Sequence, residues 1–427
     1  MKGKIMRRAD PSDPYAGNIL IRGLGPIMPP IEAAAYLTWR PAMPIGVGEI
    51  ERHIRIHHLM AVCDLHVPSP MEIRLLTTTD LLVRRAYGYR DPSLPSTWGV
   101  LSGEAPRRGQ IIVSGSAAVV EGISGTGKTQ GCLRCINCYP SPIIEHLTFP
   151  GLNGGLVQVV SLSVEVPPSG RAADFARALM EAWHRATGST RFAHWLTKDR
   201  IVDGMKALDE WLQVARSHFL GILHLDEIQN LFKLSSLRQR RDRKGASSAP
   251  DLSIVEDQVL RWILKLTNGL IPVLISGTPD GIGALSKRLS TLERINMMGY
   301  HPFEPFDDPA DPAFLDIFLG ELGKYQYVKR PIAIDKQLAD LIVNLTGGVQ
   351  RIIIALWIAA HRVAFDRTKS DDLRLEDFVV AASTWLAPLA PAVAALRAKD
   401  SEKMAKYEDL IKRDTTFWAS FWGNVRA

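Results

Sequence analysis

The middle of the chain contains four short, predominantly apolar runs. They lie at Ala117–Gly122, Leu156–Val166, Gly221–Glu227 and Ile271–Pro279. Strands buried on both faces have continuous apolar runs rather than alternating ones, which is typical of parallel sheets. Apolar residues recur at helical spacing between them, in a segment that begins near Lys128 and in Ala172–Arg185, Ile201–Arg216 and Ser253–Thr267. This alternation of strands and helices predicts an α/β fold with a parallel sheet.

The regions on either side have a helical pattern. Residues 47–90, 311–365 and 373–386 carry apolar residues three and four positions apart. Residues 1–30 are rich in proline and glycine, and we expect an extended arm there. The pattern predicts four parts: an arm and helices over 1–90, an α/β core over 91–305, a small helical lid over 306–390 and a charged, helical tail over 391–427.

Composition and charge narrow the class of protein only slightly. The chain has 51 Lys and Arg against 45 Asp and Glu, and this net charge of +6 permits contact with a polyanion without requiring it. The longest apolar run, Ile352–Ala360, is far shorter than the roughly 18 residues of a membrane helix. The basic N-terminus has no apolar stretch behind it, so no signal peptide is expected. We therefore expect a cytoplasmic protein without membrane contact.

Three of the four cysteines, Cys132, Cys135 and Cys138, have CxxCxxC spacing. This spacing suggests a zinc site. The segment is expected to be helical, however, which places these thiols along one side of a single helix, whereas a tetrahedral site needs ligands from several directions. Buried packing is the favoured interpretation.

The first apolar run leads directly into a phosphate-binding motif. Residues 122–129, GISGTGKT, fit G-x-x-x-x-G-K-[ST] between a strand and a helix. Backbone N–H groups of such a loop and the helix N-terminus surround phosphates. Lys128 is expected to reach the β- and γ-phosphates and Thr129 to bind Mg²⁺. The residues expected to bind ATP here are Gly122, Ser124, Gly125, Thr126, Gly127, Lys128, Thr129 and Gln130.

Two later strands end in residues that complete such a site. The run LHLDE ends in Asp226, expected to hold Mg²⁺ together with Thr129, and in Glu227, expected to orient or polarise the attacking water. An acid directly after the aspartate favours hydrolysis over phosphoryl transfer to another acceptor. The next strand ends in ISGTP, residues 275–279. Its Thr278 is the better candidate for a hydroxyl near the γ-phosphate, and Ser276 is the reserve. The alternative is that this segment is only the turn that ends the strand.

Arginines supply the remaining charge in sites of this kind. Arg288 and Arg294 are candidates for a finger that enters a neighbouring subunit, and Arg351 is a candidate for contact with the phosphates in cis. Each of the three is otherwise a surface arginine.

Taken in order, these motifs resemble those of the TnsC/TniB ATPases, which regulate transposition in Tn-type elements. The likeness lies in GISGTGKT followed by CYPSPIIEH, in LHLDEIQNL and in IPVLISGTP, and it covers roughly residues 45–365. It implies an AAA+ P-loop core with a helical N-terminal segment and a small α-helical lid. Lys128, Thr129, Asp226 and Glu227 match the family's nucleotide site and Thr278 its sensor position. The segment SKRLSTLERINMM, around Arg288 and Arg294, departs from the family pattern.

The resemblance also implies a function and partners. The protein would be a slow, regulatory ATPase that assembles on double-stranded DNA as a homo-oligomeric ring or filament. It would bridge a TniQ/TnsD-type target selector and transposase subunits of the TnsA/TnsB type, with ATP hydrolysis controlling assembly. A helicase-loader-like or remodelling AAA+ ATPase, and a nucleotide-gated signalling NTPase without DNA binding, are the alternatives.

Two further segments suggest surfaces for DNA and protein. A basic cluster follows the Asp-Glu strand and either contacts DNA phosphates or is a solvated loop; it consists of Arg238, Arg240, Arg241, Arg243 and Lys244. Four C-terminal aromatic residues share one face of a short helix and either dock a partner or fold back on the lid; they are Phe417, Trp418, Phe421 and Trp422.

Overall fold

The computed structural model describes residues 14–102, 116–234, 252–268, 270–286, 298–367 and 370–398. They form two compact units, each assembled from separate stretches of the chain. The sheet unit comprises residues up to Pro30, Arg74–Glu121 and Thr129–His301. The helical unit comprises Ile31–Ile73, Gly122–Lys128 and the chain from Pro302 onward. The N-terminal region over 1–90 is therefore divided between the two units.

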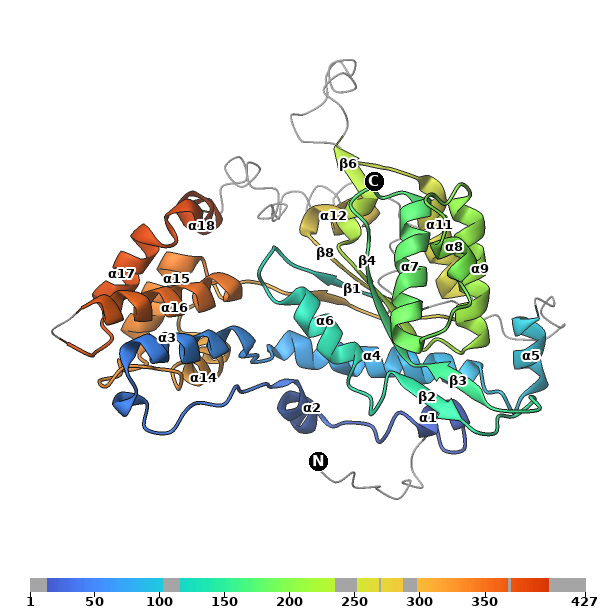
Figure 1. Cartoon of the computed structure of the whole chain (residues 1–427), viewed down its shortest axis with the longest axis horizontal. Helices are drawn as coiled ribbons and strands as arrows, with labels where there is room; N and C mark the ends of the chain where they lie inside the picture. The colour runs from blue at the N-terminus through green and yellow to red at the C-terminus, as the bar shows by residue number, and fades with distance from the viewer. Residues whose placement is uncertain are drawn as a thin grey trace, which may run out of the picture. The chain divides into compact units, whose positions relative to one another are not determined.

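A five-stranded sheet forms the centre of the sheet unit (Figure 1). Its strand order is β4-β5-β8-β1-β9, and the pairs β4–β5, β5–β8 and β8–β1 are parallel. The expected α/β fold with a parallel sheet is thus confirmed. Every residue of β1, β5 and β8 is buried, which explains why these runs are predominantly apolar rather than alternating. The strands are β1 (Ala117–Glu121), β4 (Ser161–Glu165), β5 (Ile222–Asp226), β8 (Val273–Gly277) and β9 (Tyr300–Pro302).

Two of the expected elements have different limits in the structure. The run Leu156–Val166 is not one strand: β3 (Leu156–Val159) pairs antiparallel with β2 (Ile143–His146), and only β4 enters the main sheet. Both strands contain buried apolar residues on either side of the break, so the apolar run does not reveal it. Likewise, the helix expected from Ser253 begins later, as α11 (Asp257–Asn268), because Leu252–Ile254 form β7 against β6 (Phe232–Leu234).

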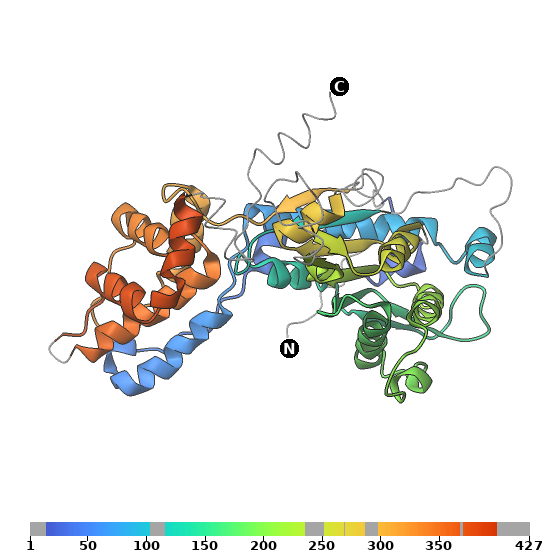
Figure 2. The same cartoon turned by 90° about the horizontal axis from the view of Figure 1, so that it is seen from above.

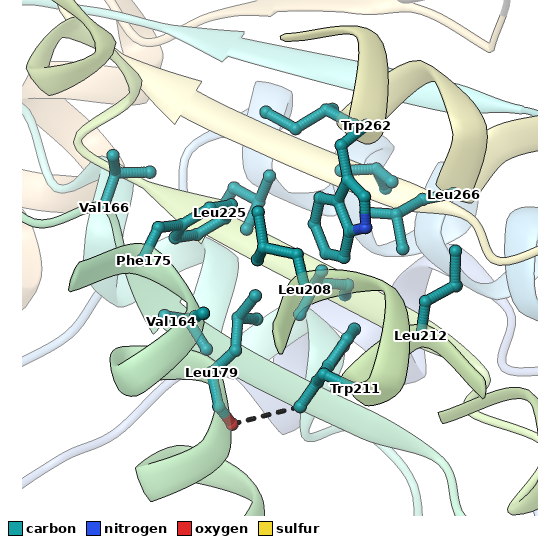
Figure 3. Close-up of a cluster of buried hydrophobic side chains, with 14 of the residues drawn as sticks. Val164, Val166, Phe175, Leu179, Leu208, Trp211, Leu212, Leu225, Trp262 and Leu266 are labelled. Atoms are coloured by element: carbon teal, nitrogen blue, oxygen red, sulfur yellow. Dashed lines mark hydrogen bonds between the residues drawn. The ribbon is translucent and has the colours of Figure 1, made fainter. Parts of the chain in front are cut away.

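Several helices of the sheet unit bury their apolar faces in one large core. In the part drawn in Figure 3, side chains from α7, α9 and α11 meet those of β4 and β5. Trp211 is fully buried, its indole N–H donates to the Leu179 carbonyl at 3.2 Å, and its ring lies edge-on to Trp183. The helices of this region are α4 (Pro70–Tyr89), α5 (Pro95–Leu101), α6 (Lys128–Ile136), α7 (Ala172–Thr187), α8 (Ala193–Leu196), α9 (Gly204–Ser217) and α12 (Pro279–Ser286).

The N-terminal segment is packed where the structure describes it, rather than extended as expected. Residues 19–22 form α1 (Ile19–Arg22), with Leu20 and Ile21 buried. The Asn18 side-chain amide donates to the Tyr87 carbonyl at 2.9 Å, and that of Gln158 donates to the Leu20 carbonyl at 3.0 Å. Leucine and isoleucine at these positions outweigh the surrounding proline and glycine because their side chains are buried within the sheet unit.

The helical unit joins an N-terminal stretch to the C-terminal helices. In Figures 1 and 2, α3 lies among helices more than 250 residues later in the chain, and its Leu59 packs in the same core as Trp357. No single helix in the described ranges is long and apolar enough to cross a membrane; two bent pairs, 336–346 with 350–366 and 375–384 with 387–398, meet that criterion by length and composition only. The elements are α2 (Pro30–Leu37), η1 (Val47–Glu49), α3 (Arg52–Leu59), η2 (Met60–Asp64), η4 (Ala313–Leu319), α14 (Gly320–Leu322), α15 (Lys336–Thr346), α16 (Gln350–Asp366), α17 (Leu375–Thr384), η5 (Ala387–Leu389) and α18 (Ala390–Ala398).

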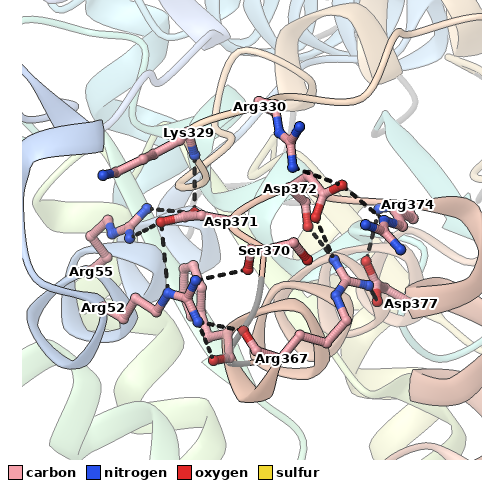
Figure 4. A network of polar contacts seen from close by, with 11 residues as sticks. Arg52, Arg55, Lys329, Arg330, Arg367, Ser370, Asp371, Asp372, Arg374 and Asp377 are labelled. Carbon is pink, nitrogen blue, oxygen red and sulfur yellow. Dashed lines mark hydrogen bonds and ion pairs between the residues drawn. The ribbon is translucent and has the colours of Figure 1, made fainter.

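A network of charged side chains fixes α3 within this unit (Figure 4). Arg55 is 2% exposed and donates to both carboxylate oxygens of Asp371 and to the Tyr327 carbonyl. Burial alone would raise the pKa of Asp371, but the hydrogen bond from Arg55 and another from the Lys329 backbone hold it below its usual value. Because a buried arginine without its carboxylate is costly, this contact ties residues 52–59 to the segment between α16 and α17.

A buried histidine makes the stability of the helical unit sensitive to acid. Burial lowers the pKa of His361 from its usual 6.5 to about 4, and its Nδ1–H donates to the Trp357 carbonyl at 2.8 Å. Between these two pH values the unfolded chain binds a proton that the folded chain does not, so this stability is present above pH 6.5 and lost toward pH 4. His361→Leu should reduce the fall in unfolding free energy over this range by roughly 3 kcal/mol.

Urea unfolding of both proteins at several pH values from 7 to roughly 4 measures this effect. Leucine at this position keeps the apolar packing and removes the imidazole Nε2, which is buried without a hydrogen-bond partner in the described structure. The same acid sensitivity in the variant and in the parent protein would contradict the assignment.

Candidate nucleotide site

The phosphate-binding loop has the local geometry that its sequence predicts. It connects β1 to α6, and α6 begins at Lys128. Gly125 and Gly127 both have φ of +88°, a region that favours glycine. The Thr126 hydroxyl and the Lys128 amine both donate to the Ile123 carbonyl, at 2.9 and 3.0 Å. Of the other expected ATP-binding residues in this segment, Ser124 is half-buried and Gln130 is exposed.

The loop also meets the start of α16 within the helical unit. The Arg351 backbone N–H donates to the Gly125 carbonyl at 3.1 Å, and the Arg351 side chain is exposed. A Cβ on Gly127 would lie 2.8 Å from Oε1 of Gln350. The structure thus brings the expected cis arginine to the loop. It adds Gln350, which the sequence pattern did not single out because a glutamine at a helix start carries no signal of its own.

In the sheet unit, the residues expected to bind the metal ion are in direct contact. The Thr129 hydroxyl donates to Oδ2 of Asp226 at 2.7 Å, where β5 ends, and Asp226 is 6% exposed. Across the described ranges, no three His, Cys, Asp or Glu side chains form a metal-binding group. A hydroxyl and one carboxylate fit Mg²⁺, which is usually bound by one or two protein oxygens, waters and substrate phosphates.

Glu227 is held in an uncommon backbone conformation. Its φ and ψ are 55° and 45°, in the left-handed region that is unfavourable for residues other than glycine. The Gln229 side-chain amide donates to the Glu227 carboxylate, and Oε1 of Gln229 accepts from the Thr278 backbone N–H at 3.2 Å. Gln229 begins no recognisable motif, so the sequence did not reveal it. It lies in η3 (Ile228–Leu231), the turn that follows the carboxylates.

Of the two candidates for a hydroxyl near the γ-phosphate, Ser276 is the one whose hydroxyl bonds to Asp226, the carboxylate expected to bind the metal ion. It donates to Oδ1 of Asp226 at 2.5 Å and lies 2.8 Å from Nε2 of His224. Thr278 follows the end of β8 and is buried, and its backbone carbonyl accepts from Ile282 at 3.0 Å. Burial lowers the pKa of His224 to about 4 despite the nearby charge of Asp226. His224 is therefore neutral at physiological pH.

The residues still to be placed are the three closely spaced cysteines and the candidates that lie outside the described ranges. Cys132 and Cys135 are buried in α6, and burial raises the pKa of Cys138 to about 12. Both arginine-finger candidates, the basic cluster and the C-terminal aromatic residues lie outside the described residues. These are Arg288, Arg294, Arg238, Arg240, Arg241, Arg243, Lys244, Phe417, Trp418, Phe421 and Trp422.

Comparison with known families agrees with this geometry. Residues 113–284, which include the loop, both carboxylates and Ser276, match the family described as AAA domain. The chain contains an AAA+ ATPase-like domain. No curated protein matches the chain in sequence.

Among solved structures, this chain is similar to the Walker-type ATPase PABY2304 of Pyrococcus abyssi. The identity is 11%, the TM-score is 0.36, and the match covers 66% of this chain and 71% of that one. It is also similar to the RuvB Holliday junction branch migration motor of Thermotoga maritima, at 16% identity and a TM-score of 0.32, over 69% of this chain and 67% of that one. At such low TM-scores, neither similarity indicates an activity.

Proposed function

We propose that this protein is an ATP-hydrolysing AAA+ regulator of DNA transposition that oligomerises on double-stranded DNA. The observation that carries the proposed nucleotide binding is the 2.7 Å contact between Thr129 and Asp226. Thr129 lies on the helix that follows the phosphate loop. The resemblance of the ordered motifs to the TnsC/TniB ATPases supports the remainder, including a bridge between a target selector and the transposase.

The site's own residues suggest how ATP would be bound and hydrolysed. Backbone N–H groups of the loop and the Lys128 amine bind the phosphates, which requires the amine to leave the Ile123 carbonyl. Thr129 and Asp226 hold Mg²⁺, which when bound neutralises the charge on the phosphate oxygens. Glu227 orients the attacking water and accepts its proton once Gln229 releases the carboxylate.

DNA binding is assigned to the basic cluster over residues 238–244. Changing its four arginines and one lysine to alanine should weaken DNA binding about tenfold or more. The loss should be the same for every duplex sequence, because contacts with phosphates do not depend on the bases. The slope of log affinity against log salt should flatten by about one for each phosphate that the variant no longer neutralises.

Fluorescence anisotropy with two unrelated duplexes, over a range of salt concentrations, measures both effects. Arg185→Ala with Arg191→Ala is the control, since both arginines are exposed on the sheet unit and neither belongs to the basic cluster. Unchanged affinity and an unchanged salt slope in the cluster variant would remove this segment from the DNA-binding surface.

The proposed function is tested by negative-stain electron microscopy of the protein with double-stranded DNA, with and without a slowly hydrolysed ATP analogue. Nucleotide-dependent rings or filaments threaded by DNA are the expected result. Rings that form without DNA would favour a remodelling ATPase. Monomers in both conditions, with nucleotide bound, would favour a nucleotide-gated switch and overturn the DNA role.

A further inference from the structure

A chain of buried polar side chains extends from the metal-binding carboxylate into the sheet. It starts at Asp226, continues through Ser276 and His224, and ends at Ser163. The three contacts measure 2.5, 2.8 and 2.8 Å. His224 and Ser276 are both 0% exposed. We call Asp226, Ser276, His224 and Ser163 the carboxyl cluster. The last three come from the adjacent strands β8, β5 and β4, so the cluster belongs entirely to the sheet unit.

The contact of Ser276 with Asp226 fixes the direction of the hydrogen bonds next to the carboxylate. A carboxylate only accepts, so the single hydroxyl proton of Ser276 is donated to Asp226. The Ser276 oxygen must then accept from Nε2–H of His224. In a neutral imidazole the other nitrogen is an acceptor, so Nδ1 accepts from the Ser163 hydroxyl. The opposite tautomer would leave two acceptors 2.5 Å apart at Ser276 and Asp226.

The cluster constrains one oxygen of Asp226 and leaves the other available. Oδ1 accepts from the Ser276 hydroxyl and from the Glu227 backbone N–H at 3.0 Å. Oδ2 accepts from Thr129, the other residue expected to bind the metal ion. With two donors on Oδ1, the carboxylate plane is fixed independently of Thr129.

A histidine within β5 is not explained by packing. The strand reads ILHLD, and all five positions are buried. Burying an imidazole costs free energy unless its nitrogens are hydrogen-bonded, whereas leucine would fill such a position without that cost. Both nitrogens of His224 are bonded, and the chain of bonds ends on the one carboxylate of the strand.

We propose that His224 is a positioning residue for the magnesium site. Through Nε2–H it orients the Ser276 hydroxyl toward Oδ1 of Asp226, and thereby presents Oδ2 to Thr129 and to the metal ion. Asp226, which only accepts, sets the tautomer of His224 through Ser276, and Ser163 holds the imidazole ring at Nδ1. This inference rests on the proposed nucleotide function. It assigns these residues a role in metal affinity and none in binding the nucleotide without metal.

The test separates affinity for Mg²⁺ from affinity for the nucleotide. A fluorescent ADP is titrated in EDTA and at a series of Mg²⁺ concentrations, and Mn²⁺ bound to the protein–ADP complex is counted by electron paramagnetic resonance. His224→Leu and Ser276→Ala should each raise the half-saturating Mg²⁺ concentration about tenfold or more, as removal of a partner behind a metal ligand usually does. Their affinity for ADP in EDTA should remain that of the parent protein.

Three further variants make the result specific. His224→Gln retains an amide N–H that is able to donate to Ser276, so it should recover most of the Mg²⁺ affinity. Ser163→Ala should have a smaller effect in the same direction, and it keeps the test usable if His224→Leu fails to fold. His361→Leu is the matched control, because it removes the other fully buried histidine, which lies in the helical unit.

The outcomes distinguish this inference from the function on which it rests. Failure of the parent protein to bind nucleotide in any condition would overturn the proposed function, and this inference with it. If the parent binds Mg²⁺-ADP, then an unchanged Mg²⁺ requirement in folded Ser276→Ala and His224→Leu overturns the inference alone. So does an equal fall in affinity with and without metal, since it would indicate a merely structural role.

Discussion

Glu227→Gln is expected to lower steady-state ATP hydrolysis by about 100-fold or more while leaving Mg²⁺-ATP affinity within about twofold. Glutamine has nearly the same shape but cannot accept a proton from water. Asp226 and Thr129 are untouched by the change, so the groups expected to hold the metal ion and the phosphates remain. The backbone of residue 227 is already in the left-handed region, and neither side chain relieves that strain.

Phosphate release, measured together with the binding of a fluorescent ATP analogue, separates the two effects. Glu181→Gln, an exposed glutamate on α7 of the sheet unit, is the control and should match the parent protein. The variant should also slow the disassembly of DNA-bound oligomers, because hydrolysis is proposed to control assembly. Hydrolysis at the parent rate would show that another group activates the water. Disassembly at the parent rate would separate hydrolysis from assembly.

The sequence was sufficient to predict the residues that lie at the ends of buried parallel strands. Asp226 is the last residue of β5, and Lys128 is the first of α6, where the motif places it. These predictions succeed because they depend on local order: a continuous apolar run, then a polar residue, then a turn or helix. The carboxyl ends of parallel strands meet at one edge of a sheet, so motifs far apart in sequence come together there.

Long-range partners were not predictable in the same way. Arg55 pairs with Asp371 across 316 positions of sequence, and no local pattern indicates that α3 belongs with the C-terminal helices. The contact of Ser276 with Asp226 is also invisible to motif reading, because it depends on β5 and β8 being neighbours in the sheet. Similarly, Val160, which lies between β3 and β4, donates its N–H to the Pro142 carbonyl while its carbonyl accepts from the Ile222 N–H. Both partners lie far away in sequence, so no local pattern marks this point.

Gly125→Val is expected to reduce nucleotide affinity by about 100-fold or more, the largest effect expected of any change in the loop. Two independent obstacles oppose the substitution. A β-branched residue is strongly disfavoured at a φ of +88°. The added Cβ would also lie 2.9 Å from Cγ1 of Val349 and 3.1 Å from Cβ of Arg351, and Val349 is 1% exposed. Relief requires the loop to move away from the start of α16, which breaks the hydrogen bond from Arg351 N–H to the Gly125 carbonyl.

Gly188→Val separates the steric effect from the backbone effect. Gly188 has φ of +67° at the end of α7, yet a Cβ there would meet no atom of the described residues within 4 Å. Both variants therefore carry backbone strain of the order of 1–3 kcal/mol, but only Gly125→Val displaces the loop. Equilibrium titration with fluorescent ADP, alongside thermal unfolding, should show reduced affinity in Gly125→Val and parent-like affinity in Gly188→Val. Equal affinity in the two variants would mean that the contact between the loop and α16 is not needed to bind phosphate, and that Arg351 has no part in holding the nucleotide.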